Sequence, residues 1–189
     1  VEMKHEMRST WLTTVWGIDW PSVQGNSESA ITSQKNQMIK ILDSLAVNNF
    51  NSVCFQVRTM SDAFYKSSYE PWSSALTGTR GTNPGYDPLA FAIEEAHKRG
   101  MELHAWINPY RAKTKGTKSL GLKHPYKKDP ERFVHFDGML IFNPALQDNR
   151  DYICTIVTDI VKRYDVDGLH IDDYFYPYPV PGVEFYDEA

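Results

Sequence analysis

Residues 167–172 read Asp-Gly-Leu-His-Ile-Asp, and this stretch decides the fold. Leu169 and Ile171 share one face of the predicted strand, and that face is apolar. His170 and Asp172 share the other face, which is polar. An open sheet with helices on both sides needs apolar residues on both faces. In a barrel only the outer face meets helices, and polar side chains at the carboxyl ends of the strands line a site inside. The stretch therefore favours a (β/α)8 barrel.

Two earlier stretches, residues 51–57 and 101–107, repeat this alternation. Each has an apolar face that can pack against a helix layer. Its other face is largely polar, and the polar residues gather toward the carboxyl end of the strand. The inward-facing residues of these two strands and the positions just after them are, in chain order, Cys54, Gln56 and Arg58, then His104, Trp106 and Asn108. The same argument therefore applies to three strands in succession.

Helical periodicity appears in three segments, near residues 38–45, 89–96 and 153–164, and each is followed by one of these strands. A fourth predicted strand, residues 7–16, precedes the first helix. Strands that alternate with helices form a parallel sheet of right-handed units. A complete barrel has eight strands in roughly 250 residues. We therefore expect residues 1–189 to be the N-terminal half of a barrel domain, with roughly the first four β/α units.

The composition excludes several classes of protein. Apolar residues make up 41% and charged residues 23% of the 189 residues, which is typical of a globular domain. The apolar runs are too short for a membrane span, and the first residues lack the apolar segment of a secretory signal. The net charge of −4 argues against a nucleic-acid partner. Cys54 and Cys154 lie in apolar contexts, which predicts buried free thiols.

One segment departs from this acidic balance. Residues 111–135 hold eight Lys or Arg against two acidic residues, a local charge of +6. Such a run is usually a solvated surface loop. The alternative is that the loop contacts an anionic substrate, because the segment directly follows a predicted strand end. The sequence leaves both interpretations open.

Asp172 is the leading catalytic candidate, because a carboxylate at an inward-facing strand end can act as nucleophile, acid, base or metal ligand. Asp173 points the other way by alternation, but it can turn inward where the strand ends. Arg58 can bind substrate or pair with a carboxylate such as Asp172. The remaining polar candidates on the inner face are Gln56, His104, Asn108 and His170.

Aromatic residues make up 13% of the chain, and many lie in loops or at predicted strand ends. Loop aromatics are harder to bury than core aromatics, and their flat rings suit the apolar faces of sugars. Aromatic surfaces beside carboxylates are common equipment of glycosidases. The aromatic candidates for substrate contact are Trp72, Trp106, Tyr110 and Tyr174, with Arg111 beside them.

Several longer motifs point to one family. They include Phe-Gln-Val-Arg at 55–58, His-Ala-Trp-Ile-Asn-Pro-Tyr-Arg at 104–111, and the stretch 164–177 around Asp172. Further matching stretches are residues 11–16, 62–67, 69–73 and 76–78. In this order they resemble the motifs of the glycosyl hydrolase-like 10 family over nearly the whole chain.

This resemblance implies a TIM-barrel glycoside hydrolase, exported or surface-attached in bacteria, that needs no cofactor. It implies a carbohydrate substrate, such as peptidoglycan strands or another polysaccharide, with Asp172 as nucleophile or base. The second carboxylate that such chemistry requires would lie beyond Ala189, with Asp62, Glu70 and Glu184 as candidates inside the chain. The expected partner is the missing half of the barrel or a second copy of the chain.

Two other functions remain open. His170 and Asp172 have the spacing of metal ligands on one strand face, and His104 could join them, so a metal-dependent TIM-barrel hydrolase is one alternative. A non-catalytic glycan-binding barrel is the other. We expect no metal in the preferred interpretation.

Overall fold

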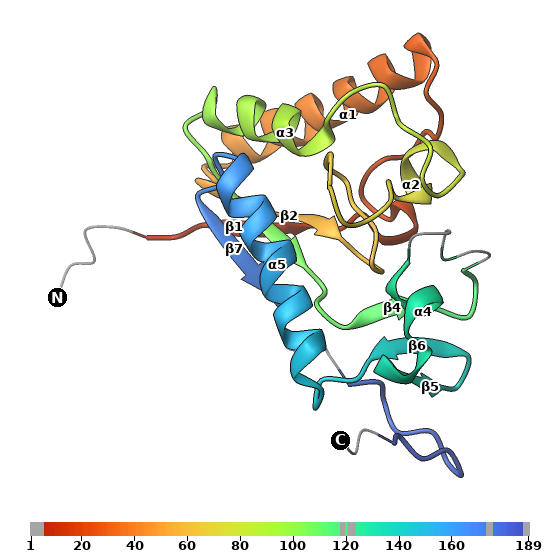
Figure 1. The fold of residues 1–189 in the computed structure, drawn as a ribbon. Helices are drawn as coiled ribbons and strands as arrows, with labels where there is room; N and C mark the ends of the chain where they lie inside the picture. Colours follow the sequence, from red (N-terminus) through yellow and green to blue (C-terminus); the bar gives the residue numbers. More distant parts are fainter. Residues whose placement is uncertain (1–5, 118–119, 121–123, 173–175, 187–189) are drawn as a thin grey trace, which may run out of the picture.

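The structure is a computed structural model, and it describes residues 6–117, 120, 124–172 and 176–186. A parallel sheet forms its centre (Figure 1). The strands in spatial order are β1 (Ser9–Leu12), β2 (Ser52–Arg58), β3 (Glu102–Ile107) and β7 (Gly168–Ile171). The four strands lie side by side in the same order in which they occur along the chain, as successive right-handed β/α units require.

One long helix connects each pair of neighbouring strands. These helices are α1 (Glu28–Val47), α3 (Pro88–His97) and α5 (Gln147–Arg163). Asp87 is the N-cap of α3, because its carboxylate accepts a hydrogen bond from the amide of Ala90. Pro88 occupies the first turn. The apolar stripes of all three helices meet β2 and β3 in one core, to which Phe55 and Ile156 contribute fully buried side chains.

No helix of the described residues covers the other face of the sheet. Trp11 on β1 faces that side and is 62% exposed. Among the described residues, α1, α3 and α5 pack in one core on a single face of the sheet, and the architecture is that of a partial (β/α)8 barrel. The sequence-based prediction of the fold class is confirmed.

Strand β1 is shorter than the predicted span of residues 7–16. It ends at Leu12 because the chain turns into the short 3-10 helix η1 (Val15–Gly17). The amides of Thr14 and Val15 donate to the side-chain oxygen of Gln56, each at 3.0 Å, instead of continuing a strand ladder. Trp16 then adopts a left-handed conformation, with φ of 54°.

The long connection after β3 contains a second sheet, which was not predicted. Its antiparallel strands, in spatial order, are β4 (Arg111–Lys113), β6 (Met139–Phe142) and β5 (Phe133–Phe136). Asp137 and Gly138 form the β5–β6 turn with φ of 46° and 76°. An Asp-Gly pair between apolar runs is a hairpin signal that the sequence does contain. This small sheet lies beyond the carboxyl edge of the main sheet (Figure 1).

Short helices complete the loops. They are α2 (Ser74–Thr77), α4 (Pro125–Lys128) and the 3-10 helix η2 (Pro130–Arg132). His124 begins α4 and packs against Phe133 and Phe142 in a second core. Burial, followed by the charges of Arg80, Arg58 and Lys127, lowers the pKa of His124 to about 3, so the ring is neutral there.

The two cysteines are both free thiols, as predicted. Cys54 is buried on β2, where burial raises the pKa of its thiol. Cys154 is exposed on α5, so the prediction that it is buried was wrong: it lies off the apolar stripe of that helix. Within the described residues, no helix is both long and apolar enough to cross a membrane.

Gly168 tests the packing of the inner face. A Cβ atom at this position would lie 2.5 Å from Nδ1 of His104, so Gly168→Ala should lower the free energy of unfolding by about 1–3 kcal/mol. Adding His104→Ala should recover most of this loss. Urea unfolding measures both effects, and Gly116→Ala is the control because no atom of the described residues lies within 4 Å of an added Cβ there. Equal stability of the two Gly→Ala variants would contradict the packing.

Candidate active site at the carboxyl edge of the sheet

The register of the parallel strands sets the height of each inward-facing residue. Trp106 is opposite Gln56 on one side and His170 on the other, so these three residues form one row. Asn108 and Asp172 each follow that row by two residues, which places them at the carboxyl edge. Asp172 is half-buried, and its Oδ1 atom is buried. The structure therefore places Asp172 and Asn108 at the same end, as expected.

His104 does not join them. It pairs with Gly168 on β7, one row below His170, and its Nε2 atom lies 2.9 Å from the carboxylate of Glu102. Four residues separate it from Asn108, which is about 13 Å along the strand. The expectation that His104 converges with Asp172 was wrong, because alternation defines the face of a strand but not the height along it.

Arg58 lies in a buried ion pair with Glu70. Its Nε and Nη2 atoms donate to the two carboxylate oxygens at 2.7 and 2.6 Å, and both side chains are fully buried. The Nη1 atom donates to the carbonyl oxygens of Asn108 and Pro109. The predicted pairing with Asp172 is thus replaced by one with Glu70. Burial alone would lower the pKa of Arg58, but the Glu70 carboxylate raises it, so the guanidinium stays charged.

The Glu70 carboxylate has two further donors. Ser61 donates its hydroxyl at 2.9 Å, and Tyr152 of α5 donates at 3.3 Å. Burial, followed by the charge of Glu70, raises the pKa of Tyr152, so this hydroxyl keeps its proton. Four elements therefore meet at one buried ion pair: the end of β2, the loop after it, the residues just after β3 and helix α5.

Gln56 also has a structural position. It is buried, and its side chain binds the amides of Thr14 and Val15 while its carbonyl accepts the Thr14 hydroxyl at 2.8 Å. These contacts hold the turn that presents Trp16. The side-chain oxygen of Gln56 is therefore used to hold this turn rather than to face a substrate directly.

Three rings cluster on the inner face. Trp11 donates its indole N–H to Nε2 of His170 at 3.0 Å, so His170 accepts there and carries its proton on Nδ1 when neutral. The Trp106 ring lies 6.2 Å from Trp11 and 6.1 Å from His170, centroid to centroid. His170 and the largely buried Trp106 therefore form the floor directly beneath Asp172.

One cavity, of about 650 Å³, lies among the loops at the carboxyl edge. The loop after β1 contributes Trp16, the loop after β2 contributes Met60, Asp62 and Arg80 among others, and the loop after β3 contributes Thr117. The strands that carry these loops are neighbours, so loops far apart in sequence enclose one space.

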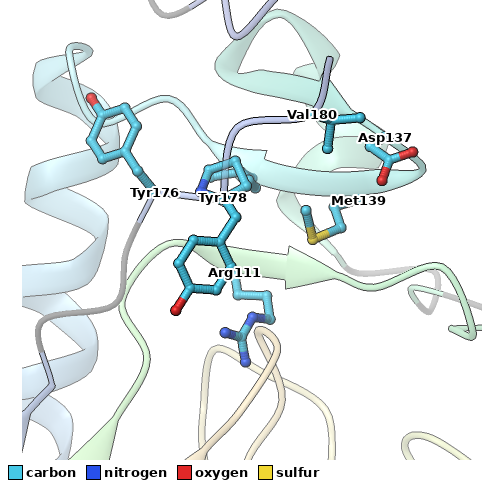
Figure 2. A pocket seen from close by; sticks show the side chains of 8 residues that line it. Arg111, Asp137, Met139, Tyr176, Tyr178 and Val180 are labelled. Atoms are coloured by element: carbon cyan, nitrogen blue, oxygen red, sulfur yellow. The ribbon is translucent and has the colours of Figure 1, made fainter. Parts of the chain in front are cut away.

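A second cavity, of about 250 Å³, lies between the small sheet and the segment that follows Asp172 (Figure 2). Arg111, Met139 and Ile141 line it from β4 and β6. Tyr176 and Tyr178 line it from the other side, and both rings are more than half exposed. This cavity joins an aromatic surface to a guanidinium near the predicted site.

The other predicted residues are dispersed. Trp72 lines a shallow hollow with Tyr86, on the outer side of the loop after β2. Tyr110 packs between the two cores. Asp173 and Tyr174 lie outside the described residues. Glu184 is exposed.

A metal site would need several ligands at one point. Within the described ranges, no three His, Cys, Asp or Glu side chains gather in this way. His104 is one row below His170, and Nε2 of His170 is occupied by the Trp11 indole. The donor set of the metal-dependent alternative is therefore not assembled by these residues.

Comparison with known proteins shows the family of the chain. A sequence profile of the glycosyl hydrolase-like 10 family matches residues 6–189. The chain belongs to this family. It is 45% identical over 186 residues to glycosyl hydrolase YngK of Bacillus subtilis, and 41% identical over 184 residues to glycosyl hydrolase DigH of Escherichia coli. Those alignments cover 97% and 90% of this chain but only 36% and 42% of the relatives.

Solved structures show the same fold at low sequence identity. A GH36 α-galactosidase from Geobacillus stearothermophilus matches with a TM-score of 0.54 and 11% identity, over 89% of this chain and 21% of its own. The maltogenic α-amylase AmyB from Thermotoga neapolitana matches with 0.55 and 14%, over 89% and 40%. A hypothetical protein from Ruminiclostridium thermocellum matches with 0.56 and 12%, over 95% and 81%. Similarity at this level concerns the fold alone.

Sequence reasoning did not select two residues that the structure brings to these surfaces. Trp11 faces inward by strand alternation, so the period-two pattern could have found it. Arg80 lies in a loop without periodicity, and its place in the larger cavity depends on the fold of that loop.

The Arg58–Glu70 pair can be tested by unfolding. Arg58→Met leaves a buried carboxylate without its cation and should cost about 3–5 kcal/mol. Arg58→Met combined with Glu70→Leu removes both charges and should cost less than the single change. Urea denaturation of the intact protein measures these values, with the exposed pair Arg8–Glu6 as the control, where the loss should stay below about 1 kcal/mol. If the loss of stability in the double variant equals the sum of the losses in the two single variants, the two charges are not coupled.

Proposed function

We propose that the intact protein hydrolyses O-glycosidic bonds in a polysaccharide, with Asp172 as nucleophile or general base. The position of Asp172 carries this proposal: it directly follows β7, two residues beyond the row formed by Trp106 and His170. Catalytic residues of TIM barrels lie at this end of the strands. Membership of the glycosyl hydrolase-like 10 family supports the same chemistry.

Hydrolysis of this kind requires a second carboxyl group, about 5–5.5 Å away in retaining enzymes and about 6.5–9.5 Å away in inverting enzymes. Glu70 is committed to Arg58, and Oδ1 of Asp62 is held by Thr59 and Met60. We therefore place the second carboxylate in a later part of the barrel. The much greater length of the curated relatives supports this placement.

We further propose that this chain is the N-terminal half of that barrel. Ile171 lies on the helix-facing side of β7 and is 43% exposed. In a longer barrel, the next helix would cover this side chain. The partner that completes the domain is the rest of the barrel or a second copy of the chain.

The preferred substrate is an anionic glycan such as peptidoglycan strands, and we place the protein outside the cytoplasm, where such strands occur. Part of the basic segment is neutralised internally, because Lys115 pairs with Asp137 at 2.8 Å. Lys127 and Lys128 remain exposed on α4, and Arg111 lines the smaller cavity. These cations support attraction of an anionic chain toward the carboxyl edge.

Replacement of the proposed nucleophile is the first test. Asp172→Asn should lower kcat of the full-length protein about 10²–10⁴-fold, because the amide can neither attack nor accept a proton. Release of reducing ends from peptidoglycan strands measures kcat. Asp165→Asn, an exposed change before β7, is the control and should leave turnover unaltered. Full activity of Asp172→Asn would remove the assignment, and glycan binding without turnover in the unmodified protein would favour a non-catalytic glycan-binding barrel.

Salt dependence tests the charge of the substrate. Surface charges steer encounter and are screened over about 10 Å at 0.1 M salt. We expect kcat/KM on anionic strands to fall with added salt more steeply than on a neutral glycan. Replacing the exposed Lys127 and Lys128 by Gln should remove most of that difference. The same salt dependence on both substrates would identify the basic segment as ordinary solvated surface.

A further inference from the structure

The larger cavity, of about 650 Å³, lies away from the proposed point of cleavage. Its walls follow β1, β2 and β3, whereas Asp172 follows β7. Two strand spacings separate the end of β2 from the end of β7, which is about 10 Å. A single sugar ring at Asp172 would not fill this cavity.

Trp16 forms one wall of the cavity, and its indole is 71% exposed. Its backbone is left-handed, with φ of 54° and ψ of 15°, which is costly for a bulky residue. The turn is nevertheless fixed, because Gln56 binds the two preceding amides. A large exposed ring on a strained but fixed turn is suited to stacking on a ligand rather than to core packing.

Asp62, which also lines the cavity, supplies a fixed acceptor. Its carboxylate is nearly buried, and Oδ1 accepts hydrogen bonds from the Thr59 hydroxyl at 2.9 Å and the Met60 amide at 2.9 Å. Within the described ranges, Oδ2 has no hydrogen-bond donor, although the residue lines the cavity. The carboxylate is therefore oriented by one oxygen and available through the other.

Arg80 supplies fixed donors beside it. Its Nη2 atom donates to the carbonyl oxygens of Met60 and Ser61 at 2.8 and 2.6 Å, which anchors the guanidinium to the Asp62 loop. Its Nε atom is buried and has no acceptor among the described residues. Ser61 has a φ of 54°, so a second strained residue supports this wall.

We infer that this cavity is a saccharide subsite, which holds one sugar of the glycan at a distance from the bond that is cleaved. The inference rests on the proposed function for the identity of the ligand. The apolar face of a pyranose ring would lie on Trp16, one hydroxyl would donate to Asp62, and another would accept from Arg80. An aromatic platform with a few rigid polar groups is the usual composition of such a site.

The test measures binding in the full-length protein carrying Asp172→Asn, so that the ligand is not consumed. The probe is a hexasaccharide of alternating N-acetylglucosamine and N-acetylmuramic acid. Trp16→Gly should weaken hexasaccharide binding about tenfold in isothermal titration calorimetry. Glycine is favoured at a positive φ, so this variant should melt no lower than its parent. Ile18→Ala, in the same turn and 63% exposed, is the matched control.

Asp62→Asn is the second variant, since it keeps an acceptor for Thr59 but removes the carboxylate. Loss of hexasaccharide affinity in both variants, with the control unaltered, supports the subsite. Parental affinity in both variants overturns it. If the unmodified protein binds the hexasaccharide through Trp16 without cleaving it, the subsite stands and the hydrolase proposal fails. If the unmodified protein cleaves the glycan while the Trp16→Gly variant binds the hexasaccharide with parental affinity, the hydrolase proposal stands and the subsite fails.

Discussion

The buried ion pair between Arg58 and Glu70 is the contact on which the carboxyl edge depends. A charge in a protein interior is costly unless an opposite charge is close and its remaining donors or acceptors form hydrogen bonds. Here the guanidinium binds two carboxylate oxygens and two carbonyl oxygens, and the carboxylate also accepts from Ser61 and Tyr152. The pair therefore fixes the relative positions of the loops that enclose the larger cavity, although neither charge reaches that cavity.

Several polar residues of the inner face build the site rather than form its surface. Gln56 holds the turn of Trp16, and His170 accepts from Trp11. The surface available to a ligand is formed instead by loop residues such as Asp62 and by Asp172 at the strand end. This division is typical of barrels, where strands supply the scaffold and loops supply specificity.

The predicted positions of the polar residues were correct where they depended on period and register. The predicted pairing partner was not: Arg58 pairs with Glu70 rather than with Asp172. Asp172 and Asn108 occupy the expected edge, because both follow strands whose alternation is regular. His104 has the expected face but the wrong height, since it lies one row below His170. The second sheet was missed because its strands are short, although Asp137 and Gly138 signalled its hairpin.

The sequence by itself determined the order of the four parallel strands and the three long helices, the face that each of these strands turns to the helix layer, and the family. These features follow from local periodicity and from motifs, which are properties of neighbouring residues. Only the tertiary structure decided which polar groups pair: Trp11 with His170 across 159 positions, and Gln56 with the Thr14 amide across 42. Buried polar groups must be satisfied by whatever lies within about 3 Å, and that distance is a property of the folded chain rather than of its order.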